Sequence, residues 1–390
     1  MKLRKFIALI VSGALCMALA AGCGSSDSSS GTSSENENKE ETALTDIQKM
    51  KYIGRTYYNE ENDRLWMGLS GSGFSFDYTG DKVSMFMTGN PGGKTDKARV
   101  GVYVDGERVK DLQIPADGEI IELDGKGSEP INVTVVKLSE CAMSCCGLIK
   151  LETNGGTVSP AADKKHRIEI IGDSITCGYG VDDPDMSHSF STATEDCTKS
   201  YSIKTANLLD ADYSLVSFSG YGIISGYSGD GKKHDDQLVP TYYDKYGFTY
   251  NSGFGGKKPQ DLEWDFSRFV PEVVVINLGT NDASYAAGNE EREKEYADSY
   301  AEFLKHVREK NPSARIYCTL GTMGTQLNEK MHEAVEAYTS STGDTNIAVV
   351  DFPLQNQNED GIAADWHPSD KTHTKSAEQL AAVIKADMGW

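Results

Sequence analysis

The chain has 390 residues, and its 59 Asp and Glu outnumber its 38 Lys and Arg, which gives a formal net charge of −21 at pH 7. This charge argues against nucleic acid and anionic lipid as ligands, because a strongly acidic surface repels both. The length allows two domains of about 100–200 residues each, and the charge favours a neutral, extracellular substrate.

The first 23 residues have the pattern of a secretory signal peptide. A basic start precedes an apolar run over residues 6–21, which is short for a membrane span and ends in small residues. Cys23 follows a glycine and resembles a lipoprotein processing site, at which it would become the lipidated first residue. Lipoprotein sites usually have a bulky aliphatic residue where this chain has Ala20, so cleavage as an ordinary signal peptide is the alternative. Residues 24–48 are polar and rich in Ser, Glu and Asn, which predicts a disordered tether. We expect a monomer at the bacterial cell surface, lipid-anchored to the membrane, or secreted.

Residues 49–155 have the period-two pattern of an all-β domain. Apolar or aromatic residues alternate with small or polar ones over residues 74–78 and 100–104, the latter just before an Asp105-Gly106 turn. Several short strands at this spacing predict a β-sandwich. The cluster Cys141, Cys145 and Cys146 has no histidine nearby, so a zinc site is not expected. We expect buried thiols near a domain junction, with a disulfide as the alternative.

From residue 160 onward the rhythm changes to strands that alternate with helices. Strands are predicted over residues 167–171, 213–218, 272–278, 315–320 and 346–352, and helices over 199–210, 291–310, 327–340 and 375–388. This alternation predicts a parallel sheet covered on both faces, with the active site at the carboxyl ends of its strands. Residues 227–258 lack periodicity and predict a long surface loop near the cleft.

Ser174 follows the first strand of this half, in the sequence Gly172-Asp173-Ser174. A serine on a tight glycine turn between a buried strand and a helix can project its hydroxyl into a cleft. Its backbone N–H then lies near a helix N-terminus, where developing negative charge is stabilised. This placement suits a nucleophile, which needs an adjacent base. Taken alone, Gly-Asp-Ser fits an ordinary turn equally well.

Two later segments offer donors for an oxyanion. A glycine in residues 217–222, after the second strand, would let a backbone N–H approach a substrate oxygen, and an ordinary loop is the alternative. Asn281 follows the third strand and can aim its amide into the cleft, although Asn-Asp is also a common turn and helix cap.

His367 is the best general base among the seven histidines. It lies in the sequence Asp365-Trp366-His367-Pro368, in a loop at the expected carboxyl edge of the sheet. From there it can take the Ser174 proton and return it to the leaving alcohol.

Ser174, a glycine after the second strand, Asn281 and His367 occur in the order that resembles the SGNH (GDSL-type) hydrolase superfamily. The resemblance implies an α/β three-layer domain with a parallel sheet over residues 160–390, and ester hydrolysis through an acyl-enzyme. It implies an oxyanion hole made by the Ser174 N–H, the Asn281 side chain and a glycine N–H, with Gly222 as our first choice and Gly220 as the second. It implies no metal and no organic cofactor.

Motifs in the N-terminal half resemble one particular family of esterases. YIGR at residues 52–55, WMGLSGSG at 66–73 and YVDG at 103–106, followed by GDSITCGYG and DWHP, resemble carbohydrate esterase family two. That family implies a jelly-roll sandwich at residues 49–155. It also implies removal of acetyl groups from acetylated xylan, mannan or glucomannan, including 6-O-acetyl hexoses.

Three aromatic residues are candidates to stack on sugar rings: Trp366, Tyr221 and Tyr285. Burial in the core is the alternative for each, and Trp366 is favoured because it adjoins His367.

The sequence leaves two candidates for the group that orients His367. The superfamily usually places an acid three residues before the histidine, where this chain has Ala364, while Asp365 precedes the histidine by two. Either Asp365 completes a Ser-His-Asp triad, or a backbone carbonyl orients the ring in a Ser-His dyad.

Two other functions fit parts of the sequence. An SGNH lipase or a deacetylase of bacterial glycans would use the same catalytic residues, and a non-catalytic glycan-binding surface lipoprotein would use the sandwich alone. The joint presence of Ser174, Asn281 and His367 argues against the non-catalytic binder.

Overall fold

The computed structural model of the chain describes residues 44–90 and 96–390. The predicted signal peptide, Cys23 and most of the predicted tether lie outside the described residues. The last part of the tether, predicted to extend to residue 48, is folded instead: Ile47 is 3% exposed, and Thr45 Oγ1 donates to the Asp63 carboxylate at 2.7 Å. Where the chain is described, no helix is both long and apolar enough to cross a membrane.

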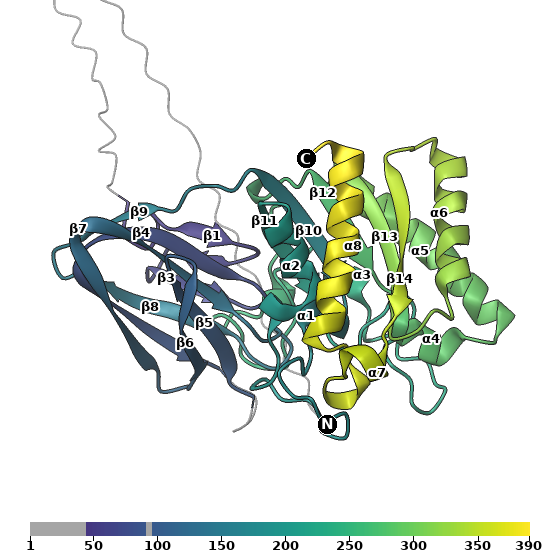
Figure 1. The fold of residues 1–390 in the computed structure, drawn as a ribbon, viewed down its shortest axis with the longest axis horizontal. Helices are drawn as coiled ribbons and strands as arrows, with labels where there is room; N and C mark the ends of the chain where they lie inside the picture. The colour runs from purple at the N-terminus through teal and green to yellow at the C-terminus, as the bar shows by residue number, and fades with distance from the viewer. Residues whose placement is uncertain (1–43, 91–95) are drawn as a thin grey trace, which may run out of the picture. The chain divides into compact units, whose positions relative to one another are not determined.

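Within the described residues, nine antiparallel strands form the N-terminal domain, at the purple and blue end of the colour scale in Figure 1. Seven of them follow the order β2-β3-β8-β4-β7-β5-β6, and β1 and β9 pair with β4. The strands are β1 (Lys51–Ile53), β2 (Tyr57–Asn59), β3 (Arg64–Met67), β4 (Gly73–Gly89), β5 (Ala98–Val104), β6 (Glu107–Ile114), β7 (Glu119–Lys137), β8 (Cys146–Glu152) and β9 (Thr157–Pro160). Because β9 still pairs with β4, this domain extends past its predicted end at residue 155.

The long strand β4 shows how the sequence builds this core. Phe74, Phe76 and Tyr78 point inward, and after a register shift at Gly80 the inward positions become Val83 and Met85. A bulge shifts the alternation by one residue and bends the strand. The predicted period-two pattern is therefore present, but in two phases along one strand.

Five parallel strands form the C-terminal sheet, in the order β11-β10-β12-β13-β14. Each overlaps a predicted strand, so the predicted parallel sheet is confirmed. The strands are β10 (His166–Gly172), β11 (Ala211–Ser217), β12 (Val273–Asn277), β13 (Arg315–Thr322) and β14 (Ile347–Leu354).

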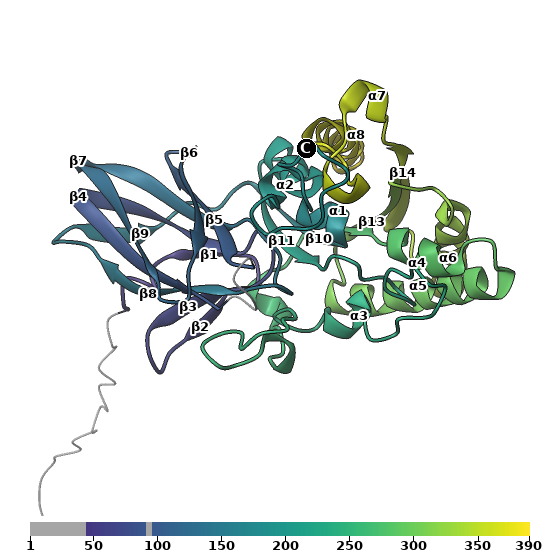
Figure 2. The same cartoon turned by 90° about the horizontal axis from the view of Figure 1, so that it is seen from below.

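Helices cover both faces of this sheet, as Figures 1 and 2 show. Val273 and Val275 of β12 share a core with α2 and α8, whereas Val274 and Ile276 share the opposite core with α5 and α6. The α-helices are α1 (Ser174–Cys177), α2 (Tyr201–Leu208), α3 (Val239–Tyr242), α4 (Thr280–Ala286), α5 (Glu290–Lys310), α6 (Asn328–Thr342), α7 (Gln357–Asp360) and α8 (Asp370–Met388). Single 3₁₀ turns are η1 (Cys197–Lys199), η2 (Pro259–Asp261), η3 (Phe266–Arg268) and η4 (Ala364–Trp366).

The strand order places two predicted site residues at one crevice. β10 comes first in the chain but lies between β11 and β12, so the strand order reverses beside it. Ligands of open parallel sheets bind outside the carboxyl ends of the strands at such a reversal. Ser174 follows β10, and Asn281 follows β12.

Arg55 joins the two domains. Its fully buried guanidinium pairs with Glu169 of β10 at 3.2 Å and donates to the backbone carbonyls of Tyr243 and Lys245. Residues 227–258 were predicted as a surface loop, but much of this segment packs into the junction, where Tyr243 and Phe254 are fully buried. Its aromatic side chains supply the apolar surface that the junction needs. The clustered cysteines are buried with free thiols.

Candidate active site

A tight strand-to-helix turn holds Ser174 at the carboxyl edge of the sheet. β10 ends at Gly172, where an added Cβ would lie 2.0 Å from Thr176 Oγ1, so the close approach requires glycine. Asp173 caps α1, because its carboxylate accepts the Ile175 N–H at 3.0 Å. Ser174 is the first residue of α1, and its N–H belongs to a helix end whose N–H groups have no intrahelical acceptor.

His367 approaches Ser174 from the loop before α8. Its Nε2 lies 2.9 Å from Ser174 Oγ, and this contact is buried. Two backbone hydrogen bonds fix the loop: the His367 N–H donates to the Ala364 carbonyl at 3.1 Å, and the His367 carbonyl accepts the Ala363 N–H at 2.9 Å. The structure thus brings together the two residues that the sequence offers as nucleophile and base.

A backbone carbonyl lies against the other ring nitrogen of His367. His367 Nδ1 is 3.0 Å from the Asp365 carbonyl oxygen. A carbonyl only accepts hydrogen bonds, so the neutral ring carries its proton on Nδ1 and presents the lone pair of Nε2 to the Ser174 hydroxyl. The carbonyl is aimed this way by two consecutive left-handed residues, Asp365 at φ 51° and Trp366 at φ 64°.

The Asp365 carboxylate points elsewhere, which corrects the triad alternative. It accepts the Tyr179 hydroxyl at 3.0 Å, and no hydrogen bond joins it to His367 in the described structure. The Tyr179 ring stacks on the imidazole, with centroids 3.9 Å apart and an interplanar angle of 18°. The left-handed backbone at Asp365 turns the carbonyl, and not the side chain, toward the ring.

Burial keeps His367 neutral. Removal from water lowers its pKa from 6.5 to about 4, and the Asp365 backbone and charge only partly oppose this. The ring is therefore ready to accept a proton at neutral pH.

Asn281 lies in the first turn of α4. Its Nδ2 donates to the Tyr221 carbonyl at 2.8 Å and, more weakly, to Asp173 Oδ2 at 3.4 Å. Burial raises the pKa of Asp173 to about 7. The amide is thus held beside the turn that carries Ser174, with one N–H only loosely engaged.

The structure corrects our first choice of glycine. The Gly222 N–H donates to the Gln237 carbonyl at 3.2 Å, and an added Cβ would lie 2.2 Å from the Ser225 carbonyl oxygen. Gly220 has φ 82° and open space beside its Cα, and its N–H donates to no acceptor in the described part of the chain. Gly220, our second choice, therefore offers the free N–H.

Asp282 holds the chain that follows these glycines. Its fully buried carboxylate accepts the N–H groups of Ile223, Ile224 and Ser225 at 2.7 to 3.1 Å. Burial raises its pKa to about 6. Asn281 and Asp282 therefore have separate roles: the Asn281 amide contacts Asp173, the residue before Ser174, and the Asp282 carboxylate anchors the loop.

The three candidate aromatic residues have different surroundings. Trp366 is 50% exposed beside His367 and offers a free ring surface. Tyr221 is 3% exposed and packs among Phe218, Tyr242 and Phe248, so its ring is part of the core and the stacking prediction is wrong for it. Tyr285 is half-buried, and the Arg292 guanidinium lies 4.1 Å from its ring centroid.

Sequence reasoning missed Tyr179. It belongs to the GYG sequence after Ser174, and a pattern of small residues around an aromatic residue was the signal that could have found it.

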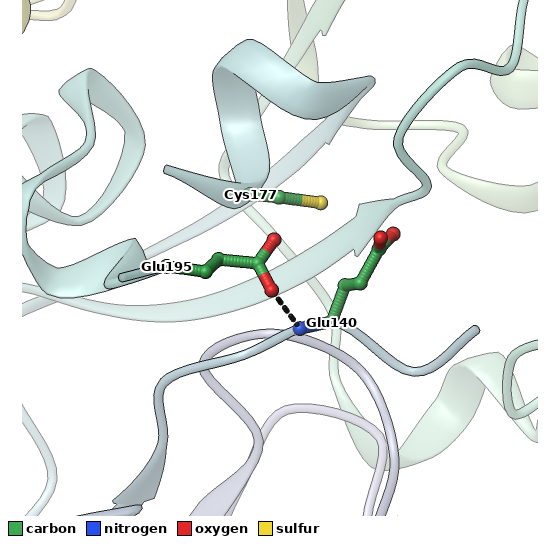
Figure 3. A group of neighbouring side chains, drawn as sticks. All are labelled: Glu140, Cys177 and Glu195. Carbon is green, nitrogen blue, oxygen red and sulfur yellow. Dashed lines mark hydrogen bonds between the residues drawn. The ribbon is translucent and has the colours of Figure 1, made fainter. Parts of the chain in front are cut away.

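One group among the described residues has the spacing of metal ligands. Glu140, Cys177 and Glu195 are fully buried, and one potential ligand atom of each lies within 4.8 Å of the others (Figure 3). The sequence predicts no metal, and no step proposed below requires one.

Known proteins resemble this chain along almost the whole described part. The sequence pattern of the GDSL-like Lipase/Acylhydrolase family matches residues 170–375, which is more than half of the chain. The chain belongs to this family. The pattern "Carbohydrate esterase 2 N-terminal" matches residues 52–171, so the resemblance to carbohydrate esterase family two and the prediction of a carboxylic ester hydrolase are confirmed.

Individual relatives of this GDSL-like hydrolase agree. The chain is 30% identical over 356 residues to "Cellulase/esterase CelE" of Acetivibrio thermocellus, covering 90% of this chain but only 41% of CelE. It is 26% identical over 343 residues to "Acetylxylan esterase / glucomannan deacetylase" of Cellvibrio japonicus, covering 87% of this chain and 89% of that protein. A family two carbohydrate esterase from Clostridium thermocellum, solved with cellohexaose, has a TM-score of 0.76 at 28% identity and covers 87% of this chain and 99% of its own.

Proposed function

We propose that the protein is a serine carbohydrate esterase that removes O-acetyl groups from plant cell-wall polysaccharides: acetylated xylan, mannan or glucomannan, with 6-O-acetyl hexoses among the targets. The observation that carries the proposal is the 2.9 Å contact between Ser174 Oγ and His367 Nε2 at the carboxyl edge of the sheet. The relative named as an acetylxylan esterase and glucomannan deacetylase supports the substrate class.

In the first half of the reaction, Ser174 Oγ attacks the acetyl carbonyl carbon while His367 Nε2 takes the hydroxyl proton. The tetrahedral oxyanion is stabilised by the Ser174 N–H, the Gly220 N–H and the Asn281 amide. His367 then gives the proton to the sugar oxygen, the ester bond breaks, and the acetyl group remains on Ser174.

In the second half, water attacks the acetyl-serine while His367 takes a proton from that water. The intermediate collapses, acetate leaves, and the proton returns to Ser174. The Asp365 carbonyl keeps the ring in one orientation throughout, as a Ser-His dyad requires. No metal or organic cofactor enters these steps.

Trp366 provides the surface that binds the sugar beside the acetyl group. Its exposed ring adjoins His367, and apolar sugar faces suit aromatic surfaces. Tyr285 is a further stacking surface on its face away from Arg292.

The rest of the chain fits an extracellular enzyme. We keep four proposals from the sequence: a jelly-roll topology for the N-terminal domain, a signal peptide, lipidation at Cys23 with a tether on the cell surface, and a monomer.

Acetate release from acetylated glucomannan, acetylated xylan and a short-chain chromogenic ester tests the proposal, with Ser174→Ala as the matched control. We expect release by the wild type, none by the variant, and a preference for one polysaccharide. If the wild type cleaves only long-chain esters, or only acetylated bacterial glycans, these would be its substrates in place of plant polysaccharides. Binding of glycan by a folded wild type that cleaves none of these esters would make the protein a binder.

A further inference from the structure

We propose that Glu140, from the N-terminal domain, is a positioning residue for the oxyanion loop, defined as residues 217–222. This inference rests on the proposed function and extends it, because it makes the N-terminal domain part of the catalytic apparatus.

The carboxylate of Glu140 holds the peptide next to the proposed oxyanion donor. Glu140 lies in the connection between β7 and β8, and its Oε2 accepts the Ser219 N–H at 2.9 Å. The following residue is Gly220, whose carbonyl accepts the Tyr227 N–H at 2.8 Å. Gly220 is thus held on one side by the bond from Ser219 to Glu140 and on the other by the bond from Tyr227 to its own carbonyl. Of these groups, Glu140 belongs to the N-terminal domain.

Glu140 is itself held in place by groups on both sides. Glu195 Oε2 accepts the Glu140 N–H at 2.8 Å, which is the dashed line in Figure 3. The Glu140 carbonyl accepts the ammonium group of Lys137 at 2.9 Å. Glu140, Glu195 and Lys137 are all fully buried, so this arrangement cannot relax into water. The backbone of Glu140 is therefore rigid enough to serve as an anchor.

The position of Glu140 is costly for the fold, which suggests a purpose beyond stability. Its Oε1 and the Oε1 of Glu195 are buried without a partner among the described residues. Burial raises the pKa of both carboxyl groups, so the pair retains a proton more readily than free glutamates. Both carboxyl groups also lie close to Cys177, which is the last residue of α1, and Ser174 is the first residue of the same helix. The buried pair is therefore near the proposed nucleophile.

Three substitutions at Glu140 distinguish the effect of its side-chain length from the effect of its charge. Glu140→Gln keeps an oxygen that can accept the Ser219 N–H but removes the charge. Glu140→Asp keeps the charge but is one methylene too short to hold the same contact, and Glu140→Ala removes both. Met85→Ala, in the core of the N-terminal domain, is the matched control for simple loss of stability in that domain.

We expect Glu140→Asp and Glu140→Ala to lower kcat for acetyl ester hydrolysis about 10- to 100-fold with KM nearly unchanged, because an oxyanion donor acts mainly in the transition state. Glu140→Gln should stay within about threefold of the wild type, and Met85→Ala should lower Tm without lowering kcat.

Wild-type kcat for Glu140→Asp, or a Glu140→Gln variant as impaired as Glu140→Ala, would overturn the proposal, since the charge or a bound cation would then matter and not the hydrogen bond. If Glu140→Ala does not fold, the Asp and Gln variants decide alone. An inactive wild type would instead refute the proposed function, so the two failures are distinguishable.

Discussion

Replacement of Asp365 by asparagine distinguishes a backbone-oriented dyad from a triad. In the structure the His367 ring is held by the Asp365 carbonyl at 3.0 Å, while the carboxylate accepts the Tyr179 hydroxyl. Asn keeps the size of the side chain and tolerates the left-handed backbone at φ 51°, so the carbonyl stays in place. The amide oxygen of asparagine can still accept the Tyr179 hydroxyl, so only the negative charge is lost.

The magnitude follows from what that charge does. The charge raises the pKa of His367, but by less than the hydrogen bond to the Asp365 carbonyl raises it and by less than burial lowers it; a change of one pKa unit corresponds to about 1.4 kcal/mol, or tenfold. We therefore expect kcat/KM of Asp365→Asn to fall less than about tenfold. In a Ser-His-Asp triad the same substitution costs about 10⁴ in kcat, so the two arrangements differ by orders of magnitude.

The assay is the hydrolysis of a chromogenic acetyl ester by wild type, Asp365→Asn, Asp365→Ala and His367→Ala, with circular dichroism to check folding. Asp365→Ala should be worse than Asp365→Asn, because alanine in left-handed backbone costs about 1–2 kcal/mol and lets the carbonyl move. His367→Ala should be inactive. A loss of about 10³ or more in folded Asp365→Asn would refute the reasoning.

Four further predictions follow from the site. An NMR titration of the His367 imidazole should have its midpoint near pH 4, because burial lowers the pKa of this ring to about 4, so that it is neutral above that pH and protonated below it; a midpoint near 6.5 for this ring would contradict its burial. Asn281→Ala should lower kcat about 10²- to 10³-fold with little change in KM, measured by steady-state kinetics. Gly222→Ala should destabilise the fold by about 1–3 kcal/mol in thermal unfolding, because its Cβ would lie 2.2 Å from the Ser225 carbonyl oxygen. Trp366→Ala should raise KM for acetylated polysaccharide but not for a small ester, and equal effects on both would remove its role in sugar binding.

Periodicity made the C-terminal domain predictable. Buried strands and amphipathic helices can each be recognised from the pattern of apolar residues over a short stretch of sequence. Their alternation along the chain predicts a parallel sheet. The chain order of Ser174, Asn281 and His367 then placed all three near one edge, because the carboxyl ends of parallel strands share that edge.

The details of the site depended on contacts that no local pattern encodes. Gly222 and Gly220 look alike in sequence, and only the acceptor at Gln237 decides which N–H is free. The orientation of His367 depends on the left-handed backbone at Asp365, where an aspartate is tolerated but not required. Glu140 reaches the site from the other domain, so its role needs the tertiary structure.

The most direct test of the account is to find the acetyl group on Ser174. Rapid mixing of the protein with a chromogenic acetyl ester, followed by acid quenching and peptide mass spectrometry, should show one acetyl group on the peptide that contains Ser174, and none in Ser174→Ala. Acetate release by wild type without acetyl-Ser174, or undiminished release by Ser174→Ala, would contradict the serine mechanism.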